Sequence, residues 1–333
     1  MWLVEMTAIE PWRLARRLAV ALLIAASCRP TAGLAALCGD NVDGRDVPCA
    51  CGDVVVSDVA LGADPVVQGP PCAHDGLIVR APDALRGVVI DLRGATLRGS
   101  GDGAGIRIVD GGRGGAQIIS SGGPATITGF SDGITARGSD TVALIEDVVI
   151  GGSRRDGVRV SSSDFEIRRV EVRTAGRDGF ALGGRDFRIA QTRAADCSRF
   201  GYSVMGTGGQ IGRPGAGNMA ERSGLAGFNV MGSGHALADC TALFGRKAGV
   251  HLQAAGLDVR GCHASDNGGD GIEGLGNAWH LGGNVAMRNA GDGITVRGVG
   301  LVDDGGNHGA DNHGMERARG AVQCAISGTP CAL

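Results

Sequence analysis

Residues 249–297 read GVHLQAAGLDVRGCHASDNGGDGIEGLGNAWHLGGNVAMRNAGDGITVR and repeat themselves at a fixed interval. Gly249, Gly271 and Gly293 each precede a bulky apolar residue and lie 22 residues apart. The same dipeptide recurs further upstream, with one interval of 26 residues that includes an insertion between Gly206 and Gly217. The upstream copies are Gly133, Gly157, Gly179, Gly201 and Gly227, with weaker ones at Gly76 and Gly105. A constant period over most of the chain predicts a repeat architecture.

Each unit contains three short apolar segments that alternate with polar residues. In the first segment the inward positions are two residues apart, as in Val250 and Leu252, which is the period of a β-strand with one buried face. Later pairs such as Leu257/Val259 and Cys262/Ala264 predict a second and a third strand. No unit shows the 3.6-residue period of a helix, and the chain has 61 glycines for tight turns. The fold class is therefore predicted as all-β, a single-stranded parallel β-helix with three short strands per turn of about 22 residues.

Stacked turns bring equivalent residues into columns along the axis of the β-helix. We expect the repeat glycines from Gly157 to Gly293 to form one column, with neighbours about one strand spacing, ~4.8 Å, apart. Asn267 and Asn289 occupy one equivalent position, where an asparagine ladder would bond the stacked backbones. A long helix within residues 130–300 would contradict this fold.

The N-terminal sequence has the layout of an export signal. Three arginines, the last of them Arg17, precede an apolar run from Leu18 to Ala26, and small residues follow. We therefore predict a signal peptide at residues 1–35, an N-terminal Cys-rich cap at 36–75, the β-helix at 76–315 and a C-terminal tail at 316–333. Cys28 lies in a loose lipoprotein-like context, which leaves surface anchoring open. The apolar run is too short to span a bilayer.

Several segments resemble right-handed parallel β-helix proteins of the pectin-lyase-like superfamily, within it a secreted bacterial group that is mostly uncharacterised. The resemblance runs from Cys38-Gly39-Asp40 through residues 72–79 and 89–97 to Gly105-Ile106, although Arg93 and Ala95 depart from the usual pattern. The closing Cys324…Cys331 segment is also typical of the group. The right-handed winding is implied by this resemblance and not by the spacing.

Ten cysteines in an exported chain favour disulfides. Cys324 and Cys331 flank a turn and are predicted to pair. Cys38 and Cys72 are the preferred N-terminal pair, with Cys49 and Cys51 unassigned, while a metal site formed with His74 is the less favoured alternative. Cys240 and Cys262 share one ladder position, so they form either a disulfide or two small buried apolar side chains. Cys197 is expected to be a buried free thiol.

No known catalytic signature of β-helix enzymes is present. The acidic motifs of polygalacturonases, the basic motif of pectate lyases, the signature of alginate epimerases and calcium-binding nonapeptides are all missing. The net charge of −3 and the lack of a basic run argue against nucleic acid as a partner. We expect no transmembrane segment, no cofactor and no metal, with Ca²⁺ as a minor alternative, and a monomer.

One outward residue per unit lies between the two inward residues of the first strand. This column is a candidate ligand-binding surface, and its members include Arg159, Ser203, Asn229, His251, Glu273 and Thr295. His251 and Glu273 lie one turn apart with Asp270 beside them, which makes these three residues candidates for acid–base catalysis. The alternative is an ordinary solvated face. The aspartates that precede the repeat glycines, such as Asp156 and Asp178, are interpreted as turn formers rather than as a row of Ca²⁺ ligands.

The sequence therefore predicts an exported β-helix that binds polysaccharide or serves as a structural rod at the cell surface or in the periplasm. The alternative is a polysaccharide lyase or glycoside hydrolase with an unfamiliar active site on the same column. Fold resemblance by itself does not establish an activity.

Overall fold

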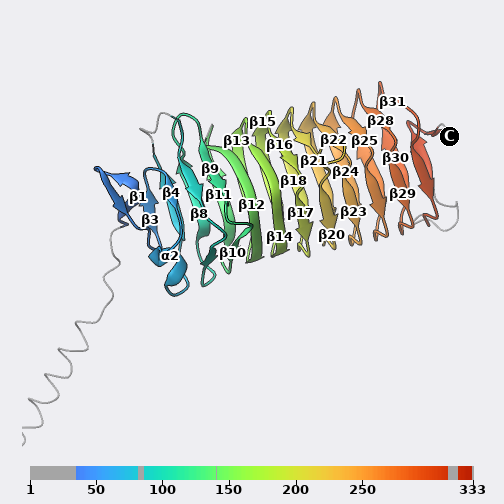
Figure 1. The fold of residues 1–333 in the computed structure, drawn as a ribbon. Coiled ribbons are helices and arrows are strands. Elements are labelled where there is room, and N and C mark those ends of the chain that lie inside the picture. Colours follow the sequence, from blue (N-terminus) through green and yellow to red (C-terminus); the bar gives the residue numbers. More distant parts are fainter. Residues whose placement is uncertain (1–34, 82–85, 140, 314–321, 332–333) are drawn as a thin grey trace, which may run out of the picture. The chain divides into compact units, whose positions relative to one another are not determined.

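The computed structural model describes residues 35–81, 86–139, 141–313 and 322–331. Residues 1–34, which contain nearly all of the predicted signal peptide and Cys28, lie outside the described residues. Residues Leu37–Leu333 form one compact unit in which successive coils stack along a common axis (Figure 1). This unit is the predicted parallel β-helix. In the described residues, no helix is long and apolar enough to cross a membrane.

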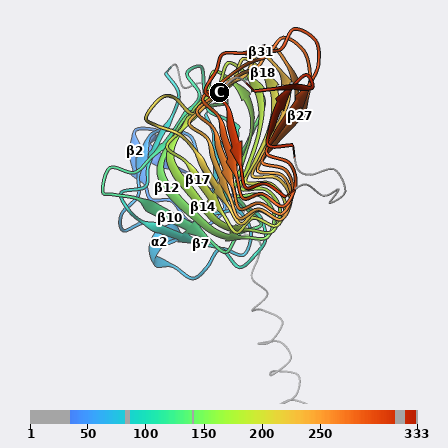
Figure 2. The same ribbon diagram turned by 90° about the vertical axis from the view of Figure 1, so that its right-hand side faces the viewer.

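Sheet 1 collects the first strand of each coil, and Figure 2 views this stack along its axis. Its strands are β1 (Leu37–Val42), β2 (Arg45–Val47), β3 (Asp53–Val55), β5 (Leu77–Arg80), β8 (Ala104–Asp110), β11 (Asp132–Arg137), β13 (Val158–Ser163), β15 (Phe180–Arg185), β18 (Tyr202–Thr207), β21 (Phe228–Ser233), β24 (Val250–Ala255), β27 (Ile272–Leu275), β30 (Ile294–Arg297), β33 (Cys324–Ile326) and β34 (Thr329–Pro330). All neighbours pair in parallel except at the two ends, where β2 and β34 turn back as antiparallel strands.

Sheet 2 contains the second and third strands of the coils. Its strands are β4 (Val59–Ala60), β6 (Val89–Asp91), β7 (Thr96–Arg98), β9 (Ala116–Ile119), β10 (Ala125–Thr128), β12 (Val142–Ser153), β14 (Glu166–Ala175), β16 (Arg188–Ala190), β17 (Arg193–Ala195), β19 (Gln210–Ile211), β20 (Met219–Glu221), β22 (Ala236–Ala238), β23 (Thr241–Leu243), β25 (Asp258–Arg260), β26 (His263–Ser265), β28 (His280–Gly282), β29 (Val285–Met287), β31 (Val302–Asp303) and β32 (His308–Ala310). The four-residue α2 (Pro65–Gln68) is the one helix of the described residues.

The repeat glycines form the expected column because nothing larger fits between the coils. A Cβ built on Gly179 would lie 2.7 Å from the carbonyl oxygen of Gly201, and one on Gly249 would lie 2.8 Å from that of Gly271. The same close approach connects Gly76, Gly105 and Gly133 to the column. These glycines are therefore required by contact with the next coil.

Inward side chains of equivalent positions stack on one another and fill the core. The rings of Phe180, Tyr202 and Phe228 are stacked, with centroids 4.8 and 4.5 Å apart. The predicted asparagine ladder is present: Asn289 Oδ1 accepts from the side-chain amide of Asn267 at 3.0 Å, and Asn312 continues the ladder. These ladders satisfy buried polar groups at the corners, where the β-sheet hydrogen bonds are interrupted.

Two of the four disulfides agree with the sequence analysis, and one predicted pair was wrong. Cys324 pairs with Cys331, and Cys240 with Cys262 across adjacent coils, while Cys197 is buried and free. The predicted Cys38–Cys72 pair does not form. Cys38 pairs instead with Cys49, and Cys51 with Cys72. Four neighbouring cysteines allow three pairings that the spacing alone does not distinguish.

The four-residue insertion is located away from sheet 1. It falls between β19 and β20, both of which belong to sheet 2. Its residues line none of the hollows on the outward face of sheet 1.

Candidate functional site

The candidate residues share one column on the outward face of sheet 1. The strand register aligns Arg159 with Ala181, Ser203, Asn229, His251, Glu273 and Thr295 in consecutive coils. Arg107 and Thr135 extend the same column on β8 and β11. The sequence period therefore placed these residues correctly, and their surroundings divide the face into two parts.

Aspartates at the start of sheet 1 form a ladder that connects the coils. The backbone N–H of Asp156 donates to Asp132 Oδ1 at 3.2 Å, and the backbone N–H of Asp178 donates to Asp156 Oδ1 at 3.2 Å. Burial raises the pKa of the Asp178 carboxyl. These aspartates thus accept hydrogen bonds from the backbone at the turns, in agreement with their interpretation as turn formers. Among the described residues, no group of His, Cys, Asp or Glu side chains is arranged to hold a metal ion.

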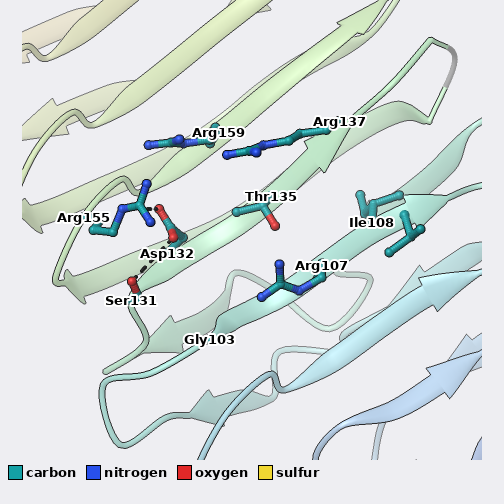
Figure 3. Close-up of a pocket in the computed structure, with 10 residues that line it drawn as sticks. Gly103, Arg107, Ile108, Ser131, Asp132, Thr135, Arg137, Arg155 and Arg159 are labelled. Carbon is teal, nitrogen blue, oxygen red and sulfur yellow. Dashed lines mark hydrogen bonds and ion pairs between the residues drawn. The ribbon is translucent and has the colours of Figure 1, made fainter. Parts of the chain in front are cut away.

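Six arginines surround the N-terminal half of the outward face, and we call this surface the arginine groove. It consists of two hollows of about 370 and 800 Å³ that share Arg137 and Arg159. The arginines are Arg107, Arg137, Arg155, Arg159, Arg177 and Arg199. Figure 3 shows the guanidinium groups of Arg107 and Arg159 on opposite sides of Thr135, with Arg137 beside Arg159.

Carboxylates balance this cationic surface only in part. Arg107 forms a bidentate pair with Asp75 at 2.7 and 2.8 Å, and Arg159 Nε lies 2.6 Å from Asp156 Oδ2. The approaches of Arg177 to Asp156 at 3.9 Å and of Arg199 to Asp178 at 3.7 Å are longer.

Arg137 stands apart from these pairs, because it makes no ion pair among the residues that the structure describes. Figure 3 shows Arg137 beside Arg159, whose charge is balanced by Asp156. The positive charge of Arg137 is therefore available to an anionic ligand.

The larger hollow exists because one coil carries almost no side chains on its outer face. β15 presents Ala181 and Gly183 there, between Arg159 on β13 and Met205 on β18. Met205 and Met231 provide an apolar floor, and Arg199 lies over the ring of Phe200, 5.3 Å from its centroid. Ser203 and Asn229 line the same hollow. A cationic rim above an apolar floor suits an extended ligand that carries anionic groups and C–H surfaces.

The second part of the face is the acid–base cluster of His251, Asp270 and Glu273. His251 Nδ1 and Glu273 Oε1 are 2.9 Å apart, and Asp270 lies close enough to Glu273 for the two carboxyl groups to influence each other's pKa. The cluster lines a hollow of about 450 Å³ together with Asp292, Thr295 and Arg297. The structure therefore brings together all three residues that were proposed as an acid–base group.

Contacts within the cluster shift each proton affinity. The hydrogen bond to Glu273 raises the pKa of His251, and the same bond lowers the pKa of Glu273. Burial raises the pKa of Asp270 to about 6, helped by the neighbouring Glu273 charge. Glu273 consequently stays ionised and favours the protonated imidazole of His251, whereas Asp270 exchanges its proton near pH 6. Such shifted proton affinities are found at sites that transfer protons and also in structural ion pairs.

Sequence reasoning missed four of the six groove arginines. Arg155 and Arg177 each precede the aspartate of their unit, and Arg199 occupies the same position one unit later. This recurrence at 22 residues was a usable signal. Arg137 had no such signal, because it lies in the second outward column, two residues after Thr135.

Comparisons with known proteins bear on the fold. No protein-family model matches the sequence, and no curated protein is significantly similar to it. Among solved structures, the A-module of the mannuronan C-5 epimerase AlgE4 of Azotobacter vinelandii is similar, with 14% identity and a TM-score of 0.44 over 78% of this chain and 80% of that one. The catalytic unit of a thermostable GH87 α-1,3-glucanase of Streptomyces thermodiastaticus has 14% identity and a TM-score of 0.35 over 81% of this chain and 65% of that one. Both likenesses concern architecture alone. With its parallel coils of three short strands, the chain is a parallel β-helix, as the sequence predicted.

Proposed function

We propose that this chain is an exported protein that binds an acidic polysaccharide along the outward face of sheet 1. The observation that carries the proposal is the arginine groove, in which Arg137 lacks a carboxylate partner in the described residues and lies beside Arg159. A polymer with one carboxylate or sulfate per sugar would place anions at intervals along the stack and neutralise these guanidinium groups.

The geometry favours an extended ligand over a compact one. The two hollows join at Arg137 and Arg159 and continue over β18 and β21 to Met231. A chain lying along the stack would therefore contact several coils in succession. A purely structural rod needs only the inward ladders and gives no reason for the cationic rim.

Export is part of the proposal and is supported by the four disulfides. Disulfides persist in oxidising compartments and are rare in the cytosol. We expect secreted or periplasmic protein from cells to have lost residues 1–35, which mass spectrometry of its N-terminus would show. A mature N-terminus at Cys28 carrying lipid would instead indicate surface anchoring.

Binding is tested by titrating the protein with polymannuronate and with neutral dextran at several salt concentrations. We expect polymannuronate to bind with an affinity that falls as salt rises, because exposed ion pairs are screened, and dextran to bind at least tenfold more weakly. The double variant Arg137→Gln/Arg199→Gln should lose roughly three- to tenfold in affinity and part of the salt dependence.

Arg173→Gln is the matched control. Arg173 is exposed on β14 of sheet 2 and pairs with Glu171, which keeps Arg193 as a partner. Its replacement should leave binding unchanged. Equal binding of polymannuronate and dextran, or equal losses in the groove variant and the control, would contradict the proposal.

A further inference from the structure

A further hollow of about 480 Å³ lies at the corner where the third strand of one coil leads into the first strand of the next. It is formed by three consecutive coils, which enter it after β17, β20 and β23. The residues that line it include Asp196, Ser198, Arg222, Gly224, Phe244 and Arg246. None of them lines the arginine groove or the hollow of the acid–base cluster.

Gly224 leaves the middle of this corner hollow open. A Cβ built on Gly224 would collide with the carbonyl oxygen of Ser198, so no side chain fits at this point. The equivalent position carries Ser198 in the coil before and Arg246 in the coil after. Bare backbone therefore separates a short hydroxyl side chain from a long cationic one.

Phe244 borders the hollow in an unfavourable conformation. Its backbone is left-handed, with φ of 56°, and its side chain contributes to a residue exposure of 55%. Bulky apolar residues rarely adopt this conformation, because the Cβ then crowds the following carbonyl oxygen. The ring makes no stacking or cation contact with any described aromatic or guanidinium group. A strained and exposed aromatic residue is the kind of outlier from which a function can be inferred.

The neighbours of Phe244 in its column show what this position holds in other coils. Arg222 and Asp266 share the left-handed conformation on either side of it. Arg222 forms a bidentate pair with Asp196 at 2.6 and 2.9 Å. Asp266 forms one with Arg288 at 2.7 and 2.8 Å. Phe244 thus interrupts a ladder of ion pairs without making a contact of its own kind.

The corner hollow also has one uncompensated positive charge. Arg222 is neutralised by Asp196, whereas Arg246 makes no ion pair among the residues that the structure describes. An aromatic ring, a free guanidinium group and the Ser198 hydroxyl therefore surround one small space. A ligand that fits them has an apolar C–H face, one anionic group and hydroxyl groups.

We propose that this hollow, which we call the Phe244 subsite, binds one uronate ring on a side branch of the polysaccharide held in the arginine groove. The inference rests on the binding function proposed above. The C–H face of the sugar packs on the ring of Phe244, its carboxylate pairs with Arg246, and Ser198 bonds one of its hydroxyl groups.

The position of the Phe244 subsite favours a branch over the main chain. Ser198 lines the subsite, and the next residue, Arg199, lines the groove. The groove continues along the stack over β15, β18 and β21, so the subsite lies beside these coils rather than beyond them. A linear chain that follows the stack passes the corner, whereas a sugar attached to that chain projects over it.

The phenylalanines provide an assay that separates the subsite from the groove. Of the seven in the chain, Phe200 and Phe244 reach solvent, and the other five are buried. In intact protein labelled with a fluorinated phenylalanine, the fluorine NMR signal of Phe244 reports on the subsite. That of Phe200, which lines the groove, reports on the polymer. Phe244→Asn and Phe200→Leu assign the two signals.

Methyl glucuronoside is the probe for the Phe244 subsite. It should shift the Phe244 signal with a Kd in the millimolar range, and methyl glucoside should bind about threefold more weakly because it lacks the ion pair. Arg246→Gln should remove this preference. Arg185→Gln is the matched control, since Arg185 is exposed, makes no ion pair among the described residues and lines none of the hollows described above.

Filling the hollow should block the probe. Ser198→Gln places a longer, uncharged side chain over Gly224, and the equivalent position already carries Arg154 and Arg246 in other coils. This variant should lose the shift of the Phe244 signal and keep the shift of Phe200 with polymannuronate.

Linear oligomannuronate distinguishes the branch from the main chain. We expect it to shift the Phe200 signal at concentrations that leave Phe244 unchanged. Methyl glucuronoside should then still shift Phe244 in protein whose groove is saturated with the oligomer.

The thermal midpoint of Phe244→Asn gives a readout that a structural role would move in the opposite direction. Asparagine tolerates the left-handed backbone, so this variant should melt at or above the temperature of the parent. A residue retained for packing would lower the midpoint when replaced.

Each alternative outcome has a defined meaning. No shift of Phe244 by methyl glucuronoside, an undiminished shift in Ser198→Gln, or a lower midpoint for Phe244→Asn would overturn the subsite. Parallel shifts of Phe200 and Phe244 by linear oligomannuronate would overturn the branch, because one chain would then cross the corner. A shift of Phe244 by methyl glucuronoside with no response of Phe200 to oligomannuronate would contradict the proposed groove binding and leave the subsite as an independent site for a sugar acid.

Discussion

Gly249 shows how one missing side chain determines the distance between neighbouring coils. A Cβ at this position would meet the carbonyl oxygen of Gly271 at 2.8 Å and the side chain of Asn267 at 2.7 Å. Gly271 and Asn267 are both held in stacked columns, so neither can move away from such a Cβ without disturbing the next coil. The contact thus explains why glycine recurs in every unit although its backbone does not need a left-handed conformation.

Replacing Gly249 with alanine should destabilise the protein by about 1–3 kcal/mol, because overpacking a rigid contact forces backbone shifts. Chemical denaturation followed by circular dichroism measures the change in unfolding free energy. Gly62→Ala is the control, since a Cβ there meets no atom within 4 Å. If the two variants proved equally stable, the close approach of the coils would not be the reason for the glycine column.

The raised pKa of Asp270 predicts a pH dependence of stability. Its folded pKa of about 6 exceeds the ordinary value of 3.8, so its contribution to stability is full below pH 4 and is lost as the pH rises through 6. Asp270→Asn retains an oxygen for the backbone N–H of Asp292 but cannot ionise. The variant should therefore gain stability relative to the parent between about pH 4 and 7, as thermal midpoints across this range would show. A constant difference would mean that Asp270 ionises normally.

At the scale of elements, the corner that follows the third strand of the C-terminal coils depends on side chains rather than on the sheet. Asn289 is fully buried after β29, where its amide donates to the carbonyl of Ala264 at 3.0 Å and its Oδ1 accepts from the backbone N–H of Asn267 at 3.1 Å. The same amide also donates to Asn312 Oδ1 in the next coil at 2.9 Å. Asn289 therefore bonds both the coil before it and the coil after it.

Asn289→Ala should cost about 2–4 kcal/mol, because it leaves several buried donors and acceptors without partners. Urea denaturation of this variant can be compared with that of Asn277→Ala. Asn277 is an exposed residue that accepts one backbone hydrogen bond from Val299, so its loss should cost less than about 1 kcal/mol. Similar losses for both variants would argue against a special role of the buried ladder.

The elements that repeat were predictable from the sequence, whereas those that occur once were not. The period fixed the column from Arg159 to Thr295 because one register governs every coil. The pairing of Cys38 with Cys49 depends on the antiparallel β1–β2 turn, which has no second copy in the chain for comparison. The arginine groove requires the outward glycine Gly183, whose effect is visible only when neighbouring coils are placed beside it.

For the whole molecule, coils interact only with their neighbours, so stability is close to a sum of similar interfaces. The Cys240–Cys262 disulfide adds a covalent link between two such coils and closes a loop of 22 residues. Chain-entropy reasoning assigns a loop of this size about 3 kcal/mol, because the cross-link restricts the unfolded chain. The outward face is on other strands, so binding should not depend on this link.

Cys240→Ala/Cys262→Ala should therefore lower the unfolding free energy by about 3 kcal/mol and leave polymannuronate binding unchanged. Trp279 reports on the C-terminal coils, because its ring is fully buried and its Nε1 donates to the carbonyl of Ala254 at 2.8 Å. Circular dichroism reports on all coils at once. Since strand pairing is continuous on both sides of the disulfide, the two signals should melt together in the parent and also in the variant, at a lower temperature. An earlier loss of Trp279 fluorescence in the variant would instead mean that the disulfide itself couples the C-terminal coils to the rest of the stack.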